Sequence, residues 1–194
     1  MCIFITKRTT LTTSTDILIE ACRQNDPKAQ LELYKQYAKA MYNTALRMLQ
    51  QQDKAEDATQ EAFIKAFQKL DEFRGESSFG SWLKRIVINE ALMIIRQEKR
   101  ILSLEESFID QIDDNEQEKY DFQEDEIKVL LHALSLLPEK LRVILNLSLI
   151  EGFDNEEICE ILHISDGNCR TTLSRAKKSL RETIEKLKNE RKYI

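Results

Sequence analysis

Basic and hydroxyl-bearing side chains recur at helical spacing near the C-terminal end of the sequence. The apolar positions 169, 173, 176 and 180 are separated by four, three and four residues, so they predict the inward face of one helix. The opposite face carries hydrogen-bond donors that suit phosphate oxygens and base edges. They are Thr171, Ser174, Arg175 and Lys178, with Arg170 and Arg181 at the edge. This surface is suited to the major groove of duplex DNA.

A shorter helix and a tight turn precede this basic helix. Asp154 is a favourable cap, and Glu156 and Glu157 follow it in the first turn. The turn includes His163, at a position where glycine is common because the backbone is left-handed, and histidine tolerates that conformation. The pattern over about 154–181 predicts a helix-turn-helix that reads duplex DNA. An ordinary helical hairpin with a solvated basic face is the alternative.

A second basic surface follows a predicted helix nearer the middle of the sequence. Its members fall within about 60° of one another on a helical wheel. They are Trp82, Arg85, Asn89, Arg96 and Arg100. Arginine pairs with phosphate and aromatic rings stack on exposed bases, so the stripe suits opened nucleic acid. The preceding loop, from Phe73 to Phe79, could hold an unstacked base; alternatively, Trp82 and both phenylalanines belong to the core.

A third polar cluster lies on the predicted helix over 53–70, where Asp57, Gln60 and Glu61 share one turn opposite an alanine-rich side. Paired carboxylates can act as acid and base, but no histidine, metal motif or glycine-rich phosphate loop accompanies them. An exposed acidic surface for a basic protein partner is favoured, with a merely solvated face as the alternative. Cys159 and His163 are one helical turn apart, but without a second pair nearby we expect no metal site.

The formal net charge of −5 would oppose DNA binding if it were evenly spread. Residues 84–100 carry a net +3 and residues 161–194 a net +5, whereas residues 101–126 carry −10. Two basic segments therefore flank an acidic one. The four cysteines form no CxxC pair, so we expect reduced thiols. No apolar run is long enough to span a membrane, so we expect no membrane contact and a cytoplasmic location.

The composition predicts an all-α protein, because only 4 Gly and 2 Pro occur and strong helix formers dominate. We expect two small helical domains joined by an acidic linker, the C-terminal domain carrying the helix-turn-helix. The expected boundaries are a tail at 1–15, a domain at 16–100, a linker at 101–126 and a domain at 127–188. Helices are expected at about 16–24, 27–49, 53–70, 77–100, 125–136, 138–150, 154–162 and 168–188.

Over about 16–100 and 127–185 the chain resembles bacterial sigma factors of the extracytoplasmic-function group, which are sigma-70-like. The segments that carry the resemblance are DKAEDATQEAF (53–63), FRGESSFGSWL with Arg85 and Asn89 (73–89), and LPEK followed by EEI through RA (137–176). In order, they look like the family's polymerase-binding helix, its promoter-melting segment and its C-terminal DNA-binding domain. Their order and spacing are more specific than any one of them alone.

The resemblance implies a sigma factor that binds core RNA polymerase and directs promoter recognition, DNA melting and transcription initiation. It implies polymerase contacts from Asp53, Asp57, Gln60, Glu61 and Phe63. It implies contacts to the −10 element from Phe73, Arg74, Ser77, Phe79, Trp82, Arg85, Asn89, Arg96 and Arg100. It implies contacts to the −35 element from Asn168, Arg170, Thr171, Thr172, Ser174, Arg175 and Lys178.

The same resemblance implies a non-catalytic protein without a cofactor, whose partners are core RNA polymerase and promoter DNA. Many members of the family are held by an anti-sigma protein, so such a regulator is a candidate partner. The acidic linker would follow the RNA exit path of the polymerase, where a negative chain can mimic RNA. The chain departs from the family at Met93, where a small residue, Asp or Asn is usual, and at Thr171 and Thr172, where Ser-Arg is usual.

The residues by themselves are compatible with two other functions. A stand-alone helix-turn-helix regulator would need tight, salt-dependent duplex binding without polymerase, and it would have no use for the 53–63 segment. A purely structural helical adaptor would tolerate loss of Arg175 and Lys178. The net charge and the acidic segment predict that the free protein binds duplex promoter DNA poorly.

Overall fold

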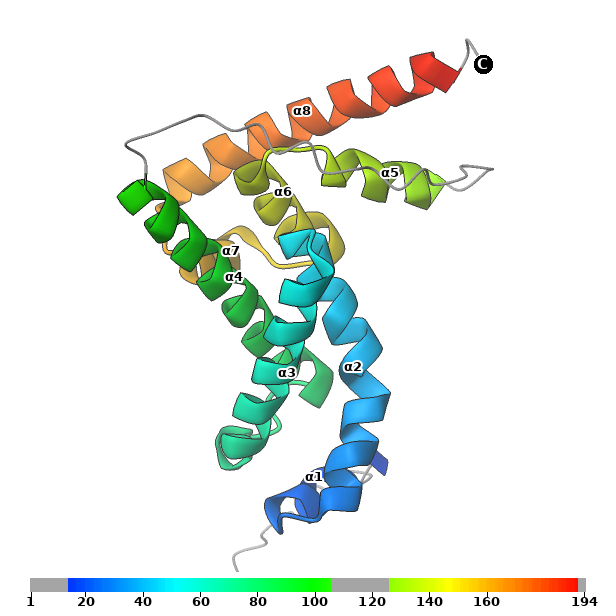
Figure 1. Cartoon of the computed structure of the whole chain (residues 1–194), viewed down its shortest axis with the longest axis vertical. Coiled ribbons are helices and arrows are strands. Elements are labelled where there is room, and N and C mark those ends of the chain that lie inside the picture. Colours follow the sequence, from blue (N-terminus) through cyan, green and yellow to red (C-terminus); the bar gives the residue numbers. More distant parts are fainter. Residues whose placement is uncertain (1–13, 106–125, 192–194) are drawn as a thin grey trace, which may run out of the picture. The chain divides into compact units, whose positions relative to one another are not determined.

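The computed structural model of the chain describes residues 14–105 and 126–191, the side chains of 100–105, 190 and 191 excepted. This part contains helices, turns and loops and no strand (Figure 1), which confirms the all-α prediction. Most of the expected N-terminal tail and acidic linker lies outside it. The described chain divides into two compact units, one of residues 14–45 and 53–92 and the other of residues 46–52, 93–105 and 126–191.

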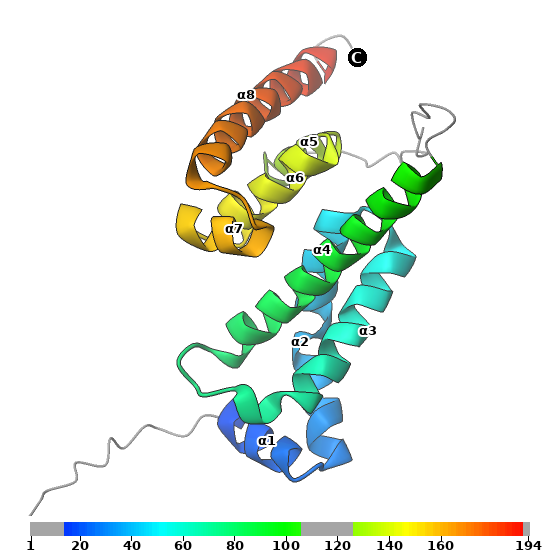
Figure 2. The ribbon, with the colours of Figure 1, turned by 90° about the vertical axis from the view of Figure 1, so that its left-hand side faces the viewer.

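The N-terminal half consists of four α-helices and one 3-10 turn. They are α1 (Ser14–Arg23), α2 (Pro27–Leu49), α3 (Gln52–Gln68), η1 (Leu70–Glu72) and α4 (Phe79–Glu105). Asn25 adopts a left-handed φ of 58° between α1 and α2, and Pro27 then opens α2 at the position where a missing N–H costs nothing. Figures 1 and 2 show α1 near the beginning of α2 and the end of α3.

Small side chains let α2, α3 and α4 approach closely. Ala55, Ala58, Ala62 and Ala66 of α3 are each at most 1% exposed, as the alanine-rich side of the sequence predicts. A Cβ at Gly80 of α4 would lie only 3.0 Å from the ring of Tyr37 on α2, so only glycine fits there without displacing the ring. The core of this unit is therefore formed by close helix contacts as well as by large apolar side chains.

The C-terminal half contains α5 (Glu126–Ser135), α6 (Glu139–Leu145), the π-helical turn η2 (Asn146–Ile150), α7 (Asn155–Leu162) and α8 (Asp166–Arg191). The long helix α8 packs against α5, α6 and α7 (Figure 2). Its inward side chains at 169, 173, 176 and 180 are all buried, which confirms the predicted stripe. The two helices of the predicted helix-turn-helix are α7 and α8.

Several predicted helix ends differ from the structure. α3 begins at Gln52, so Asp53 lies in its first turn and is not its cap, and α4 continues to Glu105 beyond the predicted end near Arg100. No glycine or proline occurs between Gly80 and Pro138, so nothing in the backbone chemistry ends α4 at Arg100. The single helix expected at 138–150 is interrupted by η2, where the buried Asn146 side chain donates to the Arg142 carbonyl at 3.0 Å.

Candidate nucleic-acid interface

The turn between α7 and α8 has the backbone that a helix-turn-helix requires. The Asp154 carboxylate accepts from the Glu157 amide at 2.9 Å, and the Glu157 carboxylate accepts from the Asp154 amide at 3.1 Å. This reciprocal capping box fixes the start of α7. His163 ends α7 in the left-handed conformation, with φ 55° and ψ 49°. The predicted left-handed histidine is therefore present.

The solvent-facing side of α8 is polar and mostly basic. Arg170, Thr171, Ser174, Arg175 and Lys178 are exposed, as the sequence predicts. Thr172 differs, because it is only 7% exposed and its hydroxyl donates to the Asn168 amide oxygen at 3.0 Å. Of the two threonines that depart from the family's pattern, Thr171 is therefore the one that faces solvent.

The cations on α8 differ in how they are engaged. The Arg170 guanidinium lies 3.0 Å from the Asp166 carboxylate, and the Lys178 ammonium lies 3.9 Å from Glu182. Ser174 and Arg175 have no hydrogen bond or ion pair with any residue that the structure describes. Arg175 is thus the cation on this face that can reach a phosphate or a base edge without first giving up a described partner.

An aromatic cluster holds both ends of the loop between η1 and α4. Phe73 is 9% exposed and Phe79 is 3% exposed, and their ring centroids lie 5.7 Å apart. The Trp82 ring lies 5.4 Å from Phe73 and 5.8 Å from Phe79. The alternative prediction, that these residues belong to the core, is therefore correct for both phenylalanines. They hold the ends of the loop, while Arg74 and Ser77 between them are exposed.

The loop itself has a defined backbone at two points. Gly75 has a φ of 72°, a left-handed conformation that glycine adopts without the steric cost of a Cβ. The Ser78 hydroxyl oxygen accepts from the Ser81 amide at 3.2 Å, which caps the first turn of α4. The exposed tip between these two points can contact a ligand while its ends are held.

The basic stripe on α4 is solvent-facing over most of its length. Arg85, Asn89 and Arg96 are exposed, whereas Trp82 is half-buried against the phenylalanines. Met93, the residue that departs from the family's pattern, is 39% exposed. Arg100 belongs to α4, and its side chain is outside the described part. The exposed stripe is thus continuous in sequence with the loop that precedes it.

The polar cluster on α3 is also exposed. Asp53, Asp57, Gln60 and Glu61 face solvent. Phe63 does not, because it is 3% exposed, with its ring centroid 4.8 Å from that of Tyr34 and 6.0 Å from that of Phe67. The predicted polymerase-binding set therefore comprises four surface residues and one buried residue.

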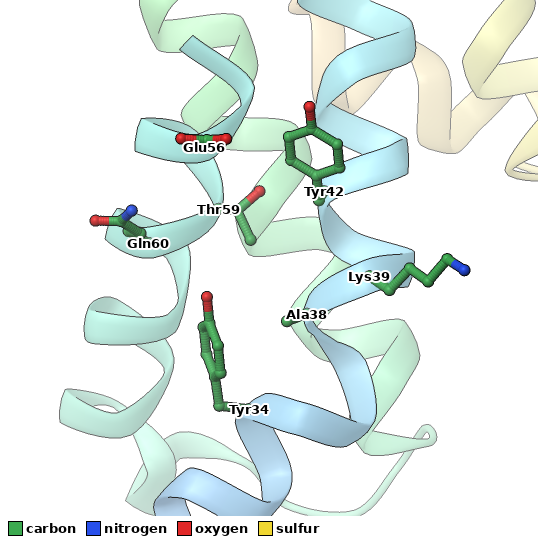
Figure 3. Close-up of a pocket in the computed structure, with 7 residues that line it drawn as sticks. All are labelled: Tyr34, Ala38, Lys39, Tyr42, Glu56, Thr59 and Gln60. Carbon is green, nitrogen blue, oxygen red and sulfur yellow. The ribbon is translucent and has the colours of Figure 1, made fainter. Parts of the chain in front are cut away.

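A shallow recess of about 310 Å³ adjoins this cluster between α2 and α3 (Figure 3). It is lined by Tyr34, Ala38, Lys39, Tyr42, Glu56, Thr59 and Gln60. Of these lining residues only Gln60 was predicted from the sequence; Glu56 and Thr59 of α3 and the whole α2 wall were missed. The tyrosines of α2 at 34 and 42 are eight positions apart, about two helical turns, and that spacing was the available signal.

Two kinds of feature are absent from the described part of the chain. No group of three or more His, Cys, Asp or Glu side chains there is arranged to hold a metal ion. None of the described helices combines the length and the apolar character needed to cross a bilayer. The polar surfaces of α3, α4 and α8 are the features that stand out.

Two segments of the sequence each match a known family. Residues 33–101 match Sigma-70 region 2, and residues 127–180 match Sigma-70, region 4. The RNA polymerase sigma-H factor of Pseudomonas aeruginosa is 30% identical over 183 residues, which cover 89% of this chain and 95% of that protein.

The chain belongs to the sigma-70-like sigma factors of the extracytoplasmic-function group.

Other relatives agree with this membership. The ECF RNA polymerase sigma-E factor of Escherichia coli is 29% identical over 184 residues, covering 88% of this sigma factor and 94% of that one. Among solved structures, the sigma factor RpoE in complex with the anti-sigma factor NepR from Bartonella quintana has a TM-score of 0.57, 24% identity and coverage of 79% of this chain and 95% of that one. CnrH in complex with the cytosolic domain of CnrY has a TM-score of 0.53, 21% identity and coverage of 87% and 96%. These two structures share the fold.

The two matched segments contain all three polar surfaces of this sigma factor. The α3 cluster, the loop and the α4 stripe fall within the region 2 match, and the basic face of α8 falls within the region 4 match. Helix α1 precedes the region 2 match. The sigma factor thus directs RNA polymerase to promoters, and its exposed surfaces are the candidates for the separate contacts that this requires.

Proposed function

We propose that three surfaces of this sigma factor divide the work of promoter use. The α3 cluster of Asp53, Asp57, Gln60 and Glu61 binds core RNA polymerase. The loop at 74–78 and the exposed stripe of Arg85, Asn89 and Arg96 engage the opened −10 element. The solvent face of α8 engages the −35 element. Because the polymerase performs the chemistry, this non-catalytic subunit acts only through such contacts.

The aromatic cluster of Phe73, Phe79 and Trp82 is the observation that supports this proposal most. It holds the ends of a loop whose tip remains exposed, and the stripe on α4 continues directly from it. Extracting a base from a stacked duplex costs a few kcal/mol, so the receiving site has to be organised before the base arrives. An exposed tip on buried anchors meets that requirement better than a freely moving loop would.

Run-off transcription with purified core polymerase tests the proposal. The full chain plus core enzyme should initiate at a subset of promoters in a genome-wide pool of templates, and neither component should do so alone. Charge reversal at Asp57 and Glu61 should abolish initiation by preventing holoenzyme assembly. The same change at Glu32, an exposed glutamate of α2, is the control. Failure to initiate at any promoter would refute the proposal.

The partners and the location follow from the same proposal. We infer that the free chain binds promoter DNA weakly, because its net charge is −5 and the duplex is a polyanion. It would act in the cytoplasm, where the core polymerase is. An anti-sigma protein is a further candidate partner, by analogy with RpoE, which is bound to NepR. A gel shift with and without core polymerase measures the first of these expectations.

A further inference from the structure

Helix α1 is connected to the loop by a single side chain. Arg23, the last residue of α1, donates from Nη2 to the Phe73 carbonyl at 2.9 Å across 50 positions of sequence. Its Nη1 donates to the Glu20 carboxylate at 3.1 Å, and its Nε lies 3.9 Å from the Asp71 carboxylate. The Arg23 side chain is 31% exposed, so these contacts are partly shielded from water.

The carbonyl that Arg23 binds belongs to the residue at which the loop departs. The Phe73 amide donates back to Leu70 at 3.2 Å, which closes η1, and Arg74 to Ser78 then follow as the exposed segment. Figure 2 shows α1 beneath η1, at the foot of the loop. The ring of Phe73 is held by the aromatic cluster, and its carbonyl is held by Arg23. Side chain and backbone of the same residue are thus fixed from different helices.

We infer that Arg23 is a positioning residue for promoter opening, because it fixes the backbone at the start of the loop that receives an unpaired base. This inference rests on the proposed function of the loop. A guanidinium suits the role, since its planar fork donates to several acceptors at once and stays charged at all relevant pH values. Glu20 and Asp71 on either side keep the fork oriented, so the carbonyl contact does not depend on one bond alone.

Limited trypsin digestion of the full chain tests the positioning without polymerase. Trypsin cleaves after Arg74, which is exposed in the loop. The R23A variant should be cut there roughly tenfold faster than the wild type, if one charged hydrogen bond is lost. The R23K variant should be intermediate, because lysine can reach one acceptor but lacks the fork. The Q24A variant, at an exposed neighbour, should match the wild type. Equal cleavage in R23A and wild type would overturn the inference.

Open-complex formation with core polymerase tests the consequence. R23A should open a duplex promoter roughly tenfold less well than the wild type, as measured by permanganate reactivity of unpaired thymines. On a promoter with a preformed bubble the defect should shrink, because no base then has to be extracted. Holoenzyme assembly should be unchanged. An equal defect on duplex and bubble would indicate a merely structural role and overturn the inference.

The two measurements separate this inference from the proposed function. If the wild-type holoenzyme opens no promoter, the proposed function fails while the trypsin comparison still decides whether Arg23 orders the loop. If the wild type opens promoters and R23A does so equally well, the proposed function stands and the inference about Arg23 fails.

Discussion

The Lys65 ammonium lies 2.7 Å from the Glu90 carboxylate, and this ion pair joins α3 to α4. Glu90 is 6% exposed, so its charge needs a partner in the folded state. The hydrogen bond to Glu90 raises the pKa of Lys65 above its usual value, although partial burial of the ammonium opposes the shift. Lys65 also lies 3.5 Å from Glu61, a longer contact. Glu90 therefore competes with the exposed acidic cluster for this ammonium.

The E90Q variant should lower the free energy of unfolding by roughly 1–3 kcal/mol. It removes the shorter ion pair of Lys65 and puts an uncharged amide in the place of the buried carboxylate. Urea unfolding followed by circular dichroism measures this. The same change at Glu32, an exposed glutamate of α2, should shift the midpoint little. Equal stabilities of E90Q and wild type would mean that solvent screens the pair.

Substitution of the cations on α8 should affect transcription unequally. R175A should reduce run-off transcription by the holoenzyme roughly tenfold, the equivalent of about 1–2 kcal/mol. R170A should reduce it less, because Arg170 is already engaged by Asp166 at 3.0 Å. K188A, at the far end of α8 beyond the region 4 match, removes the same charge and serves as the control. A larger loss in R170A than in R175A would contradict this order.

The helix faces were readable from the sequence, whereas the contacts between distant elements were not. The alanine-rich side of α3 and the inward stripe of α8 follow from a period of 3.6 residues, and both are buried as predicted. The Arg23 contact to Phe73 spans 50 positions, and no local pattern distinguishes this arginine from any other exposed one. Local periodicity specifies which face is buried, but the partner of that face depends on the whole fold.

The same distinction explains the loop and the π-helical turn. Phe73, Phe79 and Trp82 were expected either to bind a base or to belong to the core, and their spacing in the sequence is compatible with both. The structure shows that both phenylalanines are buried under an exposed loop. The π-helical turn at Asn146 was missed because a buried side-chain amide, which has no periodic signature, sits at the interruption.

The left-handed backbone at His163 predicts an unusual order of stability among variants. His163 has a φ of 55°, where a Cβ costs about 1 kcal/mol, so H163G should be more stable than H163A by about that amount. Both variants lack the imidazole, so their difference isolates the backbone. Urea unfolding measures it.

His132 in α5 provides the matched control for this comparison. Its backbone is helical, so H132G should be less stable than H132A by about 1 kcal/mol, the reverse order. If glycine were the less stable variant at both positions, the turn between α7 and α8 would not be left-handed in solution.

Burial of the Cys169 thiol predicts a loss of stability at alkaline pH. Desolvation, followed by a hydrogen bond with the Cys159 thiol, raises the pKa of Cys169 from 9.0 to about 11. A group whose pKa is raised by folding stabilises the protein fully below its unfolded pKa and less as the pH rises toward the folded value. The free energy of unfolding should therefore fall by roughly 1–2 kcal/mol between pH 9 and pH 11 through this group.

Urea titrations from about pH 8 to about pH 11 measure this slope. Lys65 loses its contribution in the same direction above its usual pKa of 10.5, so the Cys169 part has to be isolated by substitution. C169A should be less stable overall but should show a shallower decline, because it removes the titrating group. L173A truncates another buried residue of α8 and should keep the wild-type slope. An unchanged slope in C169A would show that the thiol does not titrate in this range in the folded protein.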